Sequence, residues 1–146
     1  MHKLIVMLLL STISNSAFAD WSEIGMINDD TVYVDSSTIR RNEDVVKVWF
    51  LHSYANEKMF EGSKYLSEKR LNEYNCEREE VRTHAHFFFS ESMGNGNTVF
   101  SKQQASYWKL VAPASIDYAS MELACSRLYE FKSFGKRFIN RVLNLE

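Results

Sequence analysis

The chain has 146 residues, a formal net charge of −2, 45% hydrophobic and 14% aromatic residues, and a single proline. This length suffices for one domain with its own core, and the composition excludes a disordered chain. The slightly acidic balance excludes a dedicated nucleic-acid binder, which would carry a strongly basic surface.

The first 19 residues have the three-part pattern of a secretory signal peptide. Lys3 precedes an unbroken apolar run at residues 4–10, which is too short to span a bilayer. Ala17 and Ala19 supply the small residues that a signal peptidase needs. We therefore predict cleavage after Ala19, export to the periplasm or the cell surface, and no transmembrane segment after cleavage. No cysteine follows the run, so we expect no lipid at the mature N-terminus; an uncleaved anchor is the alternative.

The chain contains two cysteines, Cys76 and Cys125. In an exported protein of this size, two cysteines predict one disulfide. A redox pair more often has Cys-x-x-Cys spacing, and a metal site would need more ligands. We therefore expect Cys76 and Cys125 to be joined and to have a structural role.

The first part of the chain predicts strands separated by polar turns. Residues 21–27 and 31–34 flank an acidic turn and predict a hairpin. The side chains at residues 35–37 compete for backbone donors, which predicts a single helical turn through residue 39. Residues 45–54 alternate in character and predict the strongest strand. Residues 55–62 are polar and predict a loop.

The following residues predict further strands. Residues 65–76 alternate, and residues 79–89 predict a strand with two distinct faces. One face is expected to hold Val81, Ala85, Phe87 and Phe89, and the other Arg82, His84 and His86. Residues 93–97 carry the glycine and asparagine of a turn, and residues 98–101 predict the returning strand. About six sequential strands favour an antiparallel sheet.

A helix is expected after Pro113, with Ser115 as its N-cap and Asp117 in its first turn. At 100° per residue its apolar stripe contains Met121, Ala124, Leu128, Phe131, Phe138, Ile139 and Val142. The stripe predicts that residues 126–146 form a helical extension. This extension would pack on the sheet, on a second copy of the chain, or on a membrane surface. The fold class is therefore α+β, with an antiparallel sheet packed against a C-terminal helix.

Residues from 21 to 125 also follow a specific order and spacing. The most specific stretch is Ser67, Lys69-Arg70-Leu71, Tyr74, Cys76 and Arg78. The other matching positions are Trp21, Tyr33-Val34-Asp35, Ser37, Ile39, Val46-Lys47-Val48-Trp49, Met93-Gly94, Gly96, Trp108, Val111, Pro113, Ser115 and Cys125. In this pattern the chain resembles the surface-adhesin protein E family of secreted bacterial proteins, with residues 20–125 as the family-like domain.

The resemblance implies an antiparallel sheet with a C-terminal helix and joined cysteines. It also implies binding to protein partners, which for the pathogen members are host proteins. The sequence departs from the family pattern at Asn75, where aspartate is frequent, and in the absence of a lipidation cysteine. The tail beyond Cys125 does not fit the family pattern.

Catalytic and metal-binding motifs are weak. His84 and His86 are expected on one face of a strand, where they could chelate a metal with His52, but a solvated strand face is the simpler interpretation. The sequence has no Gly-x-Ser-x-Gly elbow, phosphate loop or dinucleotide fingerprint. We therefore predict no enzyme activity, no metal site and no cofactor.

Three basic residues near Cys76 are the candidate partner-binding residues: Lys69, Arg70 and Arg82. Adjacent strand residues point to opposite faces, so only one of Lys69 and Arg70 can face the core side. Arg70, with Arg78 and Arg82, could form a basic patch for an acidic partner. The alternative is ion pairing with neighbouring glutamates. The three tryptophans are expected in core packing or between helix and sheet.

The sequence thus predicts a secreted, non-catalytic protein-interaction module that binds a protein partner, with host matrix proteins as candidates. A periplasmic module that holds a small apolar or anionic ligand between helix and sheet is the alternative. A hydrolase with a dispersed active site and a homodimer also stay open.

Overall fold

A computed structural model describes residues 20–27 and 29–126 of the chain. Its elements are β1 (Trp21–Ile27), β2 (Asp30–Asn42), β3 (Val45–Phe60), β4 (Ser63–Asn75), β5 (Glu80–Phe89), a 3-10 turn η1 (Ser92–Gly94), β6 (Thr98–Lys102), β7 (Lys109–Leu110) and α1 (Ile116–Cys125). The predicted signal peptide and the predicted helical extension from residue 127 onward lie outside the described residues. No helix of the described part is long and apolar enough to cross a membrane.

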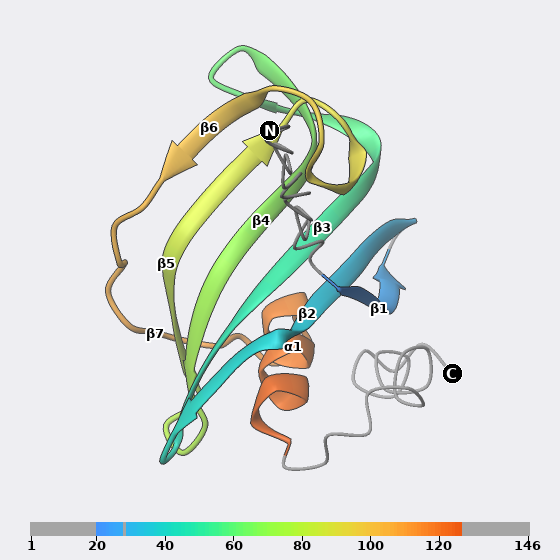
Figure 1. Cartoon of the computed structure of the whole chain (residues 1–146). Coiled ribbons are helices and arrows are strands. Elements are labelled where there is room, and N and C mark those ends of the chain that lie inside the picture. Colours follow the sequence, from blue (N-terminus) through green and yellow to red (C-terminus); the bar gives the residue numbers. More distant parts are fainter. Residues whose placement is uncertain (1–19, 28, 127–146) are drawn as a thin grey trace, which may run out of the picture.

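The strands form one antiparallel sheet in the order β1-β2-β3-β4-β5-β6, and β7 adds a short pairing to β5. Sequential neighbours therefore pair throughout, as the turn signals predicted (Figure 1). The predicted α+β fold, with about six antiparallel strands and a C-terminal helix, is confirmed.

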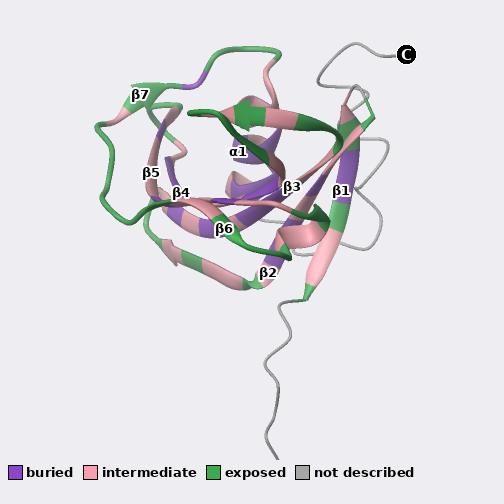
Figure 2. Ribbon diagram, turned by 90° about the horizontal axis from the view of Figure 1, so that it is seen from above, coloured by how far each residue is buried: buried purple, intermediate pink, exposed green. Residues whose placement is uncertain are grey.

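The core lies between α1 and one face of the sheet, which we call the helix face. β3 contributes Val46, Val48 and Phe50, all at most 1% exposed, and β4 contributes the fully buried Tyr74. α1 contributes Ala119, Met121, Leu123 and Ala124. Figure 2 shows buried segments, in purple, on α1 and on the strands beside it. Alternation along β3 thus places every second side chain against the helix.

Local sequence chemistry begins α1 as predicted. The predicted continuation of the helix through residue 126 is wrong at that residue, because α1 ends at Cys125 and Ser126 has a non-helical ψ of 136°. The Ser115 side chain accepts a hydrogen bond from the Tyr118 N–H at 3.1 Å, which satisfies one free donor of the first turn. Asp117 lies in that turn, where the helix dipole favours an anion. At the other end, Cys125 is bonded to Cys76, with Cα atoms 5.7 Å apart. The predicted disulfide is confirmed, and it ties the end of the helix to the end of β4.

Two local predictions are wrong. Residues 35–39 form no helical turn, because β2 continues through them with a register shift against β3. Side chains do capture backbone groups there: Asp35 Oδ1 accepts from the Ser37 N–H, and Thr38 Oγ1 accepts from the Trp49 N–H. Residues 55–60 form no loop, because β3 runs to Phe60 and pairs with β4 up to the tight turn at Glu61-Gly62. Their polar character reflects an exposed strand end.

A β-bulge in β5 changes the predicted faces of that strand. Leu71 pairs with Ala85 and Asn72 pairs with Thr83, so His84 is an extra residue between them. His84 therefore lies on the same face as Glu73, whereas His86 lies on the helix face beside Glu68. The prediction that His84 and His86 share a face is wrong, because strict alternation ignores the inserted residue.

Candidate binding site on the open face of the sheet

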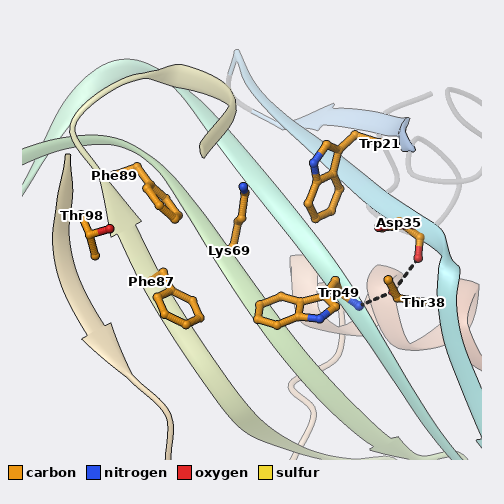
Figure 3. Close-up of a pocket in the computed structure, with 8 residues that line it drawn as sticks. All are labelled: Trp21, Asp35, Thr38, Trp49, Lys69, Phe87, Phe89 and Thr98. Atoms are coloured by element: carbon orange, nitrogen blue, oxygen red, sulfur yellow. Dashed lines mark hydrogen bonds between the residues drawn. The ribbon is translucent and has the colours of Figure 1, made fainter. Parts of the chain in front are cut away.

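The face of the sheet away from α1, which we call the open face, carries a cavity of about 430 Å³. Register places its lining on this face, since Asp35 pairs with Trp49 and Lys69 pairs with Phe87. Figure 3 shows these side chains in front of the strands, with the helix behind them. The lining residues are Trp21, Asp35, Thr38, Trp49, Lys69, Phe87, Phe89 and Thr98. Strands far apart in sequence therefore build one aromatic cavity.

Lys69 is the one basic residue among the described residues that line the cavity. Its Nζ lies 5.0 Å from the ring centroid of Phe89 and 5.8 Å from that of Trp21. Within the described part of the chain, no carboxylate forms an ion pair with this ammonium group. Partial burial lowers the pKa of Lys69, because the charged form loses solvation. The side chain is thus a cation with aromatic neighbours and no anionic partner.

The turn at η1 lies against the side chain of Lys69. Ser67 Oγ, on β4, accepts a hydrogen bond from the Gly94 N–H at 2.8 Å and donates one to the Glu91 carbonyl. Gly94 has a φ of +71° and lies directly against the Lys69 stem, where no Cβ would fit. A positive φ of this kind favours glycine, and so does the close approach of the lysine. Both reasons therefore favour glycine at position 94.

Asp35 brings a carboxylate to the same cavity. It is only 4% exposed, and its Oδ1 accepts hydrogen bonds from both the Ser37 N–H and the Ser37 hydroxyl. These donors hold the Asp35 carboxylate at the end of the cavity near Trp21. Trp21 of β1 pairs with Asp35 of β2. The cavity therefore has a cationic group and a carboxylate on its lining.

Arg82 also lies on the open face, but in a separate cluster. It donates to Glu73, which also bonds His84 Nε2 at 2.9 Å and pairs with Lys47 at 3.6 Å. Burial alone would raise the pKa of Glu73, but the hydrogen bonds from Arg82 and His84 outweigh it and lower that pKa. The Arg82 guanidinium also lies 4.5 Å from the ring centroid of Trp108. This cluster is internally paired, in contrast to Lys69.

Arg70 lies on the helix face, opposite Lys69. It donates to the buried Glu68 and pairs with Asp117 of α1 at 3.4 Å. Glu68 also accepts from His86 Nε2 at 2.8 Å and lies 3.4 Å from His52 Nδ1. Arg70 and Arg82 therefore do not form the basic patch that was expected of them. Both are ion-paired, which is the alternative interpretation of these residues.

The charge cluster on the helix face shifts several ionisation equilibria. Burial opposes ionisation of Glu68, but the His86 hydrogen bond and the Arg70 charge outweigh it and lower the pKa to about 2. Burial and the Arg70 charge lower the pKa of His52 to about 4. Glu68 is thus an anion at neutral pH and His52 is neutral, and the pairing of Glu68 with Arg70 and His86 makes this a packed structural cluster. Among residues 20–27 and 29–126, no cluster of three or more metal-ligating side chains occurs.

The aromatic residues of the cavity were not singled out from the sequence. Trp21 and Trp49 were expected in core or helix packing, but both lie half-buried on the open face, and Trp108 lies beside Arg82. Alternation along each strand could have revealed the cavity, because it puts on one face the side chains of Trp49, Lys69, Phe87 and Phe89. Combining the alternation of several strands needs the strand register, which only pairing supplies.

Comparisons with known proteins identify the same architecture. Protein E from non-typeable Haemophilus influenzae superposes with a TM-score of 0.55 at 15% identity, covering 85% of this chain and 89% of that chain. Crystal form II of Haemophilus influenzae protein E gives a TM-score of 0.53 at 17% identity, covering 64% of this chain and 79% of that chain. These likenesses show a shared fold. No curated protein matches the chain.

The sequence itself carries the family pattern across nearly all of the described residues. Residues 21–126 match the family described as surface-adhesin protein E. The match begins at the first strand and ends just after the disulfide at Cys125, so it covers the sheet, the cavity and the helix. The chain belongs to the surface-adhesin protein E family.

Proposed function

We propose that this chain is an exported, non-catalytic module that binds a protein partner through the open face of its sheet. The observation that carries the proposal is the group of half-buried aromatic side chains around an unpaired Lys69. Aromatic side chains are enriched at protein interfaces, and an unpaired cation among them offers electrostatic complementarity to an acidic partner. Membership of an adhesin family supports a binding role.

Under this proposal the three basic candidates have different roles, which their ion pairing supports. Lys69 has no anionic partner among the described residues and is available to an acidic partner protein. Arg82 lies on the same face at its paired cluster, where it can contribute at the rim of an interface. Arg70 holds Glu68 and Asp117 on the helix face, so its contribution is to the fold that presents the surface.

Surface plasmon resonance tests this function with the exported protein as it is purified. Purified extracellular matrix proteins and individual periplasmic proteins serve as the immobilised panel. Saturable binding to a panel member is expected, and Lys69→Glu should weaken it more than Arg82→Glu. Lys102→Glu is the matched control, because Lys102 is an exposed lysine on β6. If the Lys69→Glu variant binds the partner with unchanged affinity, the open face is not the binding surface.

The cellular location separates the adhesin role from a periplasmic one. A surface adhesin must be accessible to antibodies and to protease on intact cells. A periplasmic module must be protected until the outer membrane is permeabilised. Labelling of intact cells and of permeabilised cells with one antibody therefore distinguishes the two locations.

A small-ligand-binding module is the second candidate function, and the cavity around Lys69 favours it. The sequence analysis predicted such a ligand between the helix and the sheet. The cavity instead lies on the open face, away from α1. Native mass spectrometry of the purified protein, with a search for retained small molecules, tests this candidate.

A further inference from the structure

We propose that the cavity around Lys69 binds a small organic monocarboxylate that has a flat apolar body. The inference concerns a free small molecule and stands independently of any protein partner. It follows from three properties of the cavity: its unpaired cation, its aromatic walls and its fixed geometry.

The cation specifies an anionic group on the ligand. Four other described lysines form an ion pair with a carboxylate of this chain: Lys47 with Glu73, Lys58 with Asp30, Lys64 with Glu57 and Lys109 with Asp117. Lys69 is half-buried and lies over the faces of Phe89 and Trp21, with no ion pair to a carboxylate among the described residues. A half-buried ammonium group gains more from a ligand carboxylate than an exposed one, because solvent screens the interaction less.

The walls specify a flat and apolar ligand body. Trp49 and Phe87 lie 6.1 Å apart between ring centroids, and Phe87 and Phe89 lie 6.4 Å apart. These rings and Trp21 surround Lys69 in Figure 3. The volume of about 430 Å³ lies within the range of small-ligand sites, about 300–1,000 Å³. One or two fused rings fill such a space and stack on aromatic walls.

Asp35 limits the ligand to one negative charge. Its carboxylate lines the same cavity and is held there by Ser37. A second anionic group on the ligand would approach Asp35 and be repelled. A monocarboxylate can instead place its charge at Lys69 and its apolar body toward the rings.

The geometry of the site is present before a ligand binds. Gly94 lies against the Lys69 stem, and the hydrogen bond from its N–H to Ser67 Oγ holds the turn on β4, the strand that carries Lys69. A side chain that is already confined loses less conformational entropy on binding, which favours affinity. The cation and the rings are therefore already in place on the open face when a ligand arrives.

Titration with 2-naphthoate tests the proposal, and its uncharged analogue 2-naphthalenemethanol measures the contribution of the charge. The readout is the indole N–H signals of the exported, ¹⁵N-labelled protein. The Trp21 and Trp49 signals should shift with saturation, while Trp108, which lies at Arg82 outside the cavity lining, should not. We expect 2-naphthoate to bind at least fivefold more tightly than the alcohol.

Two lysine variants assign that preference to Lys69. Lys69→Met keeps an apolar stem but removes the charge, so the two probes should bind it with equal affinity. Lys102→Met should keep the wild-type preference. The proposal is overturned if the Trp21 and Trp49 signals do not shift, if acid and alcohol bind wild-type protein equally, or if Lys69→Met keeps the preference. The wild-type comparison decides the matter even if Lys69→Met fails to fold, and binding to protein partners is measured separately.

Discussion

Gly94 lies so close to Lys69 that a Cβ on Gly94 would stand 2.1 Å from Lys69 Cε. Real Cβ atoms do not approach another atom this closely, so any side chain at position 94 must displace the lysine. A glycine in the η1 turn therefore leaves room for the cationic side chain in the position that it occupies at the cavity. The relationship links a turn residue to a binding property without any direct contact between Gly94 and a ligand.

Gly94→Ala is expected to destabilise the protein and to reduce its preference for 2-naphthoate. The φ of +71° costs an alanine about 1 kcal/mol, and the displaced lysine loses its place among the rings. Gly62→Ala is the matched control: its φ is +81°, but nothing lies within 4 Å of the added Cβ. Urea denaturation should show a loss for both variants, whereas only Gly94→Ala should change the probe preference. Equal probe preferences in the two variants would contradict this role of Gly94.

Removal of the disulfide by the double change Cys76→Ser and Cys125→Ser should lower the free energy of unfolding by about 2–5 kcal/mol. The bond joins residues 49 apart and closes a loop whose entropy cost in the unfolded chain is about 4 kcal/mol. Chemical denaturation of the oxidised protein and of the double variant measures the difference. Non-reducing peptide mapping should recover the linked pair from native material, and two free thiols there would contradict the assignment.

The stability of the protein should fall as the pH is lowered from 6.5 toward 4, because of His52. The ordinary pKa of this imidazole is 6.5, but its pKa in the folded chain is about 4, since burial and Arg70 disfavour the charged form. Glu68, Asp117 and His86 also face it. Between these values the unfolded chain binds a proton that the folded chain does not, so acidification favours unfolding. The slope for one such group is at most about 1.4 kcal/mol per pH unit.

Glu68 should extend this loss to lower pH. Its pKa is about 2 in the folded chain against an ordinary value of 4.5, so the stability that it provides is lost as the pH falls between these values. Urea denaturation at steps of half a pH unit measures both windows. His52→Gln should flatten the profile between pH 6.5 and 4 and leave the loss below pH 4.5. A wild-type profile that is flat between pH 6.5 and 4 would refute the assignment to His52.

Aromatic side chains on the two faces should differ in their contribution to stability. Phe50 is 1% exposed in the core, so Phe50→Ala should cost about 3–5 kcal/mol. Phe87 is half-buried in the cavity lining, so Phe87→Ala should cost less than about 2 kcal/mol. Thermal and urea denaturation compare the two variants, and 2-naphthoate titration should show weaker binding to Phe87→Ala. A larger stability loss for Phe87→Ala than for Phe50→Ala would mean that the open face is the true core.

N-terminal sequencing of the exported protein is expected to begin at Asp20. Ala17 and Ala19 supply small residues behind the apolar run of residues 4–10, which is the pattern that a signal peptidase recognises. Ala19→Arg should block cleavage and leave Met1 on the chain, while Phe18→Arg, between the two small residues, tests position dependence. An exported wild-type protein that keeps Met1 would contradict the prediction.

The sequence by itself determined the elements whose signals are local. Alternation gave β3 its buried row of Val46, Val48 and Phe50, and the Ser115 cap and Asp117 located the start of α1. Two cysteines allowed a single intramolecular pairing, so the disulfide needed no knowledge of the fold. The strand, the helix start and the disulfide could each be predicted because the interactions that form them involve one stretch of chain or one pair of residues.

Only the tertiary structure decided where the basic and aromatic candidates lie. The extra residue at His84 separates His84 from His86, and a bulge of this kind is decided by pairing with β4. The cavity needs the register of β1 to β6 to bring Trp21, Lys69 and Phe89 together, because a shift of one residue would turn any of them to the other face. Lys69 and Arg70 are neighbours of the same chemical class, yet their strand positions give one an aromatic cavity and the other a buried carboxylate.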